Sequence, residues 1–122
     1  MLPNGALGEQ FAADYLKTQG YRILERNFHT RYGEVDIIAQ KDDILAFVEV
    51  KTRAATMLSS PAAAVTPAKQ KKLITAALQY MQANPADLQP RFDVVAIVTR
   101  SKSDFSVLNF MHLTDAFEAA SQ

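Results

Sequence analysis

Two carboxylates and a lysine, Asp36, Glu49 and Lys51, have the residue types and spacing of a metal-dependent hydrolytic site. Carboxylate oxygens are hard ligands, which suit Mg²⁺ or Mn²⁺ and not zinc. An ion held in this way lowers the pKa of an attacking water, and a neighbouring lysine can orient that water or neutralise charge on a phosphorus. We therefore predict a divalent-metal site at Asp36 and Glu49, with Lys51 as a catalytic residue. Glu34 and Glu9 are candidates to hold a second ion or its hydration shell.

A predicted β-hairpin brings these residues together. Stretches 33–40 and 44–53 are rich in β-branched and aromatic residues and flank a short polar turn. A two-residue loop would place three pairs of residues opposite one another: Asp36 with Glu49, Glu34 with Lys51, and Ile38 with Phe47. Directly opposed residues have Cβ atoms about 4.5–5.5 Å apart. Two carboxylates at that distance repel unless they share a proton or a cation.

The same charged residues also allow a purely structural interpretation. Glu34 and Lys51 would then form a plain cross-strand ion pair, as opposite charges do on many sheets. Glu9 would be an exposed glutamate in the first turns of a helix, where the helix dipole favours an acid.

Five basic residues are candidates for contact with nucleic acid. Three of them are lysines in the first two turns of a predicted helix, where cations oppose the helix dipole but can hold a phosphate. A solvated basic face is the alternative for these lysines. The five residues are Arg31, Arg53, Lys69, Lys71 and Lys72.

The composition limits the kind of protein. The 122 residues predict one domain over residues 1–122, and the lack of cysteine excludes disulfides and thiol chemistry. Thirteen basic residues balance thirteen acidic ones, so binding of a polyanion must rely on a local patch. No stretch approaches the roughly 20 apolar residues of a membrane span, and the N-terminus has no signal segment. We therefore expect a cytoplasmic protein. His29 and His112 stand alone and are interpreted as surface or turn residues.

Hydrophobic periodicity predicts an α/β fold with a mixed five-stranded sheet flanked by helices. Thr66 and Pro67 have the residue types of a helix start, and Asn84-Pro85 those of a helix end. We expect Leu73, Ile74, Ala77, Leu78 and Met81 to form the buried stripe of that helix. The expected elements are helix 5–20, strands 21–28, 33–40 and 44–53, helix 67–84, strands 92–98 and 105–111, and helix 115–120.

Asp36, twelve intervening residues and Glu49-Val50-Lys51 resemble the signature of the PD-(D/E)XK nucleases. The chain looks more closely like the YraN-like family of small bacterial proteins, itself similar to archaeal Holliday-junction resolvases. This resemblance covers nearly the whole chain. It rests on Gly8-Glu9, residues 21–27, Gly33-Glu34-Val35-Asp36, residues 47–53 and residues 91–95.

The resemblance implies a restriction-endonuclease-like core in which Asp36 and Glu49 bind metal, Lys51 is catalytic and Glu9 is the first-helix acid. The proline of the signature is absent, since Val35 precedes Asp36. The implied activity is Mg²⁺-dependent cleavage of branched or structured DNA. A non-catalytic nucleic-acid-binding or scaffold protein with the same fold is the alternative. Resolvases of this kind work as dimers, and a homodimer would place two sets of basic residues side by side.

Overall fold

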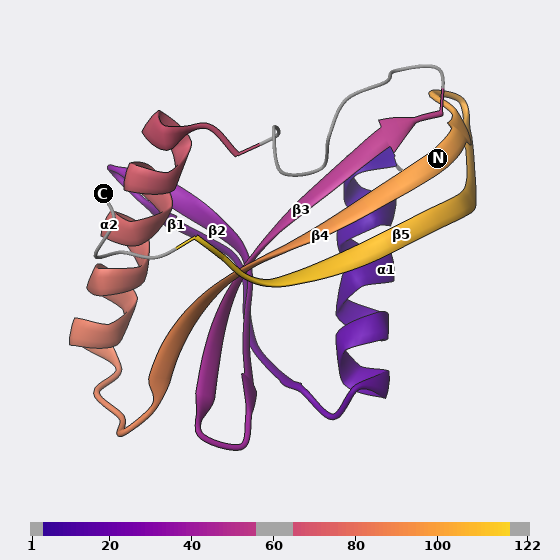
Figure 1. Cartoon of the computed structure of the whole chain (residues 1–122). Coiled ribbons are helices and arrows are strands. Elements are labelled where there is room, and N and C mark those ends of the chain that lie inside the picture. The colour runs from indigo at the N-terminus through magenta and orange to yellow at the C-terminus, as the bar shows by residue number, and fades with distance from the viewer. Residues whose placement is uncertain (1–3, 56–64, 118–122) are drawn as a thin grey trace.

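The computed structural model describes residues 4–55 and 65–117, which form two helices and five strands (Figure 1). In chain order these elements are α1 (Asn4–Thr18), β1 (Arg22–Thr30), β2 (Gly33–Lys41), β3 (Ile44–Ala54), α2 (Pro67–Ala83), β4 (Gln89–Ser101) and β5 (Asp104–Phe117). At the C-terminal end the structure differs from expectation, because residues 115–117 belong to β5 and not to a helix. The rest of the predicted closing helix lies outside the described residues.

The strands form one mixed sheet in the order β1-β2-β3-β4-β5. β3 pairs antiparallel with β2 and parallel with β4, and the two outer pairs are antiparallel. The connection from β3 to β4 contains α2, as a parallel pair requires. This arrangement confirms the predicted α/β class and matches a restriction-endonuclease-like core.

Each helix covers one face of the sheet. α1 buries Ala12, Ala13 and Leu16 against Ile37, Ala46, Val48 and Val95, whereas α2 packs on Ile38, Leu45, Phe47 and Phe92. The predicted stripe of α2 is partly wrong. Leu78 is half exposed, and Ala76 and Tyr80 are buried in its place. Tyr80 packs edge to face on Phe28 and Phe47, so an aromatic ring fills the space that the prediction gave to aliphatic side chains.

The sheet divides at one end, and this division positions the site. Pairing between β2 and β3 stops at Ile37 and Val48. Beyond these residues β2 stays paired with β1 as far as Gly33, while β3 stays paired with β4 as far as Ala54. The halves β1–β2 and β3–β4–β5 therefore diverge, as Figure 1 shows. We call the point just beyond Ile37 and Val48 the fork.

Two glycines allow the helices to approach the strands beside the fork. A Cβ on Gly8 of α1 would collide with the Thr52 hydroxyl of β3. A Cβ on Gly33 of β2 would lie 2.9 Å from the backbone oxygen of Lys72 in α2. α2 begins as predicted, because the Thr66 side chain accepts a hydrogen bond from the Lys69 amide and Pro67 follows it. Residues 54–65 are low in sequence complexity, which predicts a crossover loop beside the hairpin, but residues 56–64 lie outside the described residues.

Candidate metal centre

Asp36 and Glu49 come together at the fork. The predicted register is confirmed by the pairing of Ile38 with Phe47, but Asp36 and Glu49 lie just past the last paired residues. The Val50 amide donates a 2.8 Å hydrogen bond to Oδ2 of Asp36, so a side chain takes the place of the main-chain acceptor that β2 no longer provides. Both carboxylates are buried, with 7% of Asp36 and 5% of Glu49 exposed.

The electrostatics of this pair favour a positive charge between the carboxylates. Burial raises the pKa of Asp36 from its ordinary 3.8 to about 7, and the charge of Glu49 adds to that rise. The hydrogen bond from Val50 opposes the rise, while Glu9 and Glu34 contribute to it more weakly. At neutral pH the Asp36 carboxyl group is therefore only partly ionised.

Two lysines already face Glu49. Nζ of Lys69, from α2, lies 2.7 Å from Oε1 of Glu49, and Nζ of Lys51 lies 3.9 Å from the same oxygen. The adjoining Lys69 ammonium, followed by burial, lowers the pKa of Lys51. Burial lowers the pKa of Lys69 as well, but its contacts with Glu49 and Lys51 outweigh burial and leave that pKa raised. One buried carboxylate thus holds two ammonium groups near each other.

The donor set fits a hard divalent cation. Asp36 and Glu49 supply two buried carboxylates, and Mg²⁺ commonly binds through one or two carboxylates while keeping several waters. A divalent ion would also displace the proton that burial and repulsion hold on Asp36. Among residues 4–55 and 65–117, no group of three or more His, Cys, Asp or Glu side chains is placed to hold a metal ion. The pair would therefore be completed by water or backbone oxygen.

Glu34 and Glu9 surround the pair without joining it. Glu34 is exposed, and its carboxylate lies 3.0 Å from Nδ1 of His29 on the neighbouring strand β1. The predicted opposition of Glu34 and Lys51 is wrong, because β2 has left β3 before it reaches Glu34. Glu9 is half-buried on α1. Its charge acts on Asp36, which places it near the fork.

The five basic residues occupy different places. Lys69 and Lys72 line a cavity of about 360 Å³ together with Glu34 and Glu49. Arg53 is half-buried and lines a second cavity beside Lys51. The remaining two are exposed: Lys71 lies on α2, and the guanidinium of Arg31 lies 5.4 Å from the ring centre of Tyr32.

A buried polar cluster under α1 was not predicted. Asp93 of β4 accepts two hydrogen bonds from Arg91, at 2.9 and 2.8 Å, and lies 2.8 Å from Nε2 of His112. Arg91 also donates to the Tyr21 hydroxyl at 2.6 Å. The interpretation of His112 as a surface residue is therefore wrong. An aspartate inside the apolar run 92–98 was the available signal, because a buried charge needs a partner.

No helix within the described ranges combines the length and apolar character needed to cross a membrane.

Comparison with known proteins identifies the family. The pattern that defines the uncharacterised protein family UPF0102 matches residues 8–97. A UPF0102 protein of Syntrophomonas wolfei is 48% identical over 114 residues, covering 93% of this chain and 96% of the relative. One from Chlorobium phaeobacteroides is 47% identical over 118 residues, covering 94% and 93%. The YraN-like resemblance is thereby confirmed, and the chain belongs to the UPF0102 family.

Proposed function

We propose that the protein is a Mg²⁺- or Mn²⁺-dependent endonuclease that hydrolyses phosphodiester bonds in branched or otherwise structured DNA. The observation that carries the proposal is the buried Asp36 and Glu49 pair at the fork, with Lys51 two residues farther along β3. The restriction-endonuclease-like core and the resemblance to PD-(D/E)XK nucleases support it.

Each residue has a distinct role in this proposal. Asp36 and Glu49 would hold the ion, which supplies Lewis acidity toward a phosphate oxygen and a water of lowered pKa. The lowered pKa of Lys51 makes its ammonium more ready to exchange a proton with a reacting water. Its positive charge would also neutralise charge that develops on the phosphate. Glu34 and Glu9 would bind the hydration shell or a second ion.

Lys69 would change partners when the site fills. Its ammonium lies 2.7 Å from Oε1 of Glu49, the residue that would hold the ion together with Asp36. Once displaced, Lys69 would remain in the lining of the cavity it shares with Lys72, and the two ammonium groups would neutralise charge on a bound phosphate. Arg31 and Lys71 would contact the backbone farther out. The cytoplasmic location and the homodimer stay predictions.

A cleavage assay tests the proposal. Wild-type protein is incubated with four-way junction, flap and single-stranded DNA in Mg²⁺ or Mn²⁺, beside Lys51→Ala and the control Lys17→Ala at the far end of α1. We expect the wild type and the control to cut at least one substrate, and Lys51→Ala to be slower by at least about 100-fold. Full activity in Lys51→Ala would mean that a contaminating nuclease does the cutting.

One observation favours a second candidate, a nucleic-acid-binding or scaffold protein without catalysis. Lys69 already neutralises Glu49, so the fold does not depend on a metal ion to offset that charge. Tight binding of structured DNA with no cleavage in either metal, together with no metal-dependent rise in stability, would select this candidate.

A further inference from the structure

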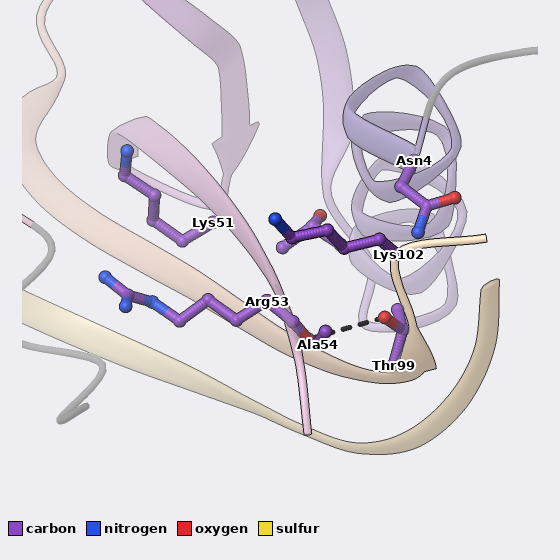
Figure 2. A pocket seen from close by; sticks show the side chains of 7 residues that line it. Asn4, Lys51, Arg53, Ala54, Thr99 and Lys102 are labelled. Carbon is purple, nitrogen blue, oxygen red and sulfur yellow. Dashed lines mark hydrogen bonds between the residues drawn. The ribbon is translucent and has the colours of Figure 1, made fainter. Parts of the chain in front are cut away.

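A basic cavity of about 450 Å³ lies next to the candidate metal centre, at the C-terminal end of β3. Figure 2 shows Lys51, Arg53 and Lys102 extending toward the same side of it, the first two from β3 and the third from the turn between β4 and β5. The other lining residues are uncharged: Asn4, Thr52, Ala54 and Thr99. Among residues 4–55 and 65–117, no carboxylate lines this cavity.

Hydrogen bonds hold the walls of the cavity in place. The Thr99 hydroxyl lies 3.4 Å from the Arg53 oxygen and 3.2 Å from the Ser101 oxygen, so it connects the end of β3 to the start of the turn that carries Lys102. The Ala55 amide donates to the Thr99 oxygen at 2.8 Å. Asn4, at the start of α1, donates to the Ser101 oxygen at 3.2 Å. The backbone segments that carry the cationic side chains are therefore held in place by hydrogen bonds.

The charge of Lys102 is available to a ligand. Lys102 is exposed, and within the part of the chain that the structure describes it makes no ion pair. Asp104, the acidic residue closest to Lys102 along the chain, forms a 3.4 Å ion pair with Arg100. In a protein with no net charge, such a local concentration of cations is what attracts an anion.

The cavity also has the right position relative to the metal centre. Lys51 belongs to both, since it faces Glu49 and lines the cavity. Arg53 is two residues farther along β3, an advance of about 6.6 Å. A DNA strand whose reacting phosphate lies at Asp36 and Glu49 would thus place its next phosphate beyond Lys51, toward Arg53 and Lys102.

We propose that this cavity binds the phosphate next to the scissile phosphodiester on the cleaved DNA strand, with Lys102 and Arg53 as its main cationic contacts. The inference rests on the proposed nuclease function and adds a subsite to it. Lys102 is the informative residue, because it lies outside β3 and, in the part of the chain that the structure describes, forms no ion pair with Glu49 or Asp36.

Binding measurements with Lys102→Ala and Lys17→Ala provide the first test. Lys17 is a matched control, an exposed lysine about 20 Å along α1 from the cavity. Fluorescence anisotropy with labelled junction DNA is recorded at several salt concentrations without divalent metal. We expect Lys102→Ala to raise Kd roughly 3- to 10-fold at low salt and to reduce the slope of log Kd against log salt by about one. Identical curves for the two variants would overturn the inference.

A methylphosphonate scan identifies the source of the phosphate. Each backbone phosphate of the strand is neutralised in turn, and binding to wild type and Lys102→Ala is compared. We expect one internal position whose neutralisation weakens the wild type but has no further effect in Lys102→Ala. Additive losses at every position would refute the subsite, as would coupling confined to a 5′-terminal phosphate or to added inorganic phosphate. A coupled internal position in a protein that never cuts DNA would uphold the phosphate site and overturn the nuclease function.

Discussion

Replacing Asp36 by Asn is expected to stabilise the metal-free protein against unfolding at pH 8. Burial and the charge of Glu49 raise the pKa of Asp36 from 3.8 to about 7, so the ionised carboxylate is less stable in the folded protein than in the unfolded chain. Asparagine removes the charge but keeps an oxygen that can accept the hydrogen bond from the Val50 amide. The substitution therefore removes the repulsion with Glu49 and keeps the Val50 amide paired.

The magnitude follows from the pKa. A rise from 3.8 to about 7 is roughly three pKa units, and at about 1.4 kcal/mol per unit the upper limit is about 4 kcal/mol. Relaxation around a buried charge lowers such figures, so we expect a gain of about 1–3 kcal/mol. Because the folded-state pKa is raised, the penalty is absent below pH 3.8, grows between pH 3.8 and about 7, and is complete above pH 7.

Urea unfolding followed by circular dichroism at pH 8, 6 and 3.5, in the presence of a chelator, measures this gain. Asp42→Asn is the control, because Asp42 is exposed in the hairpin turn with φ 53°, a conformation that asparagine adopts readily. We expect the advantage of Asp36→Asn to shrink toward zero as pH falls, and the control to show no such trend. Equal stability at pH 8, or an advantage that grows in acid, would refute the reasoning. Added Mg²⁺ is expected to stabilise the wild type and not Asp36→Asn.

Two further substitutions test the surroundings of the site. Gly8→Ala is expected to cost about 1–3 kcal/mol of stability because the new methyl group collides with the Thr52 hydroxyl. Adding Thr52→Ala to this variant is expected to restore most of that loss. Thermal unfolding of the single and double variants measures both effects, and additive losses would show that the two residues do not touch. Asp93→Asn is expected to cost about 3 kcal/mol at pH 7, since it leaves the half-buried Arg91 guanidinium without its negatively charged partner. Burial raises the pKa of Asp93, but hydrogen bonds from His112 and Arg91 outweigh it and lower the pKa below 3.8, so in urea unfolding the difference from wild type is expected to persist down to about pH 4 and to fade only in stronger acid. A stability difference that is already lost at pH 5 would contradict the lowered pKa of Asp93.

The two strands and the register of the hairpin were predictable from the sequence because they depend on local patterns, whereas residues 115–117 were wrongly predicted as a helix and belong to β5. Alternating side chains and a two-residue turn led to the pairing of Ile38 with Phe47, which the structure confirms. The same rule failed at Glu34, because it assumes that β2 and β3 stay together. β2 instead remains with β1, and Glu34 meets His29.

Contacts between distant segments were not predictable from periodicity. Lys69 was predicted as a nucleic-acid contact, and nothing in the sequence indicated that the packing of α2 on the sheet would also bring it to Glu49, twenty residues earlier in the chain. The cluster around Asp93 joins residues from β4 and β5 with Tyr21, which precedes β1. Only the presence of a charge in an apolar strand indicated that such partners must exist.

The topology around β3 also sets the order in which the site can assemble. β3 follows β2 after a two-residue turn, and an isolated hairpin forms in about 1–10 μs. Its pairing with β4 must wait for residues 55–88, which include α2. Asp36 and Glu49 therefore meet first in a hairpin still surrounded by water, where their repulsion is weak. Because burial is the main cause of the raised Asp36 pKa, we expect the repulsion to grow as α2 and β4 pack, and the electrostatic cost of the site to appear after the first contact between β2 and β3.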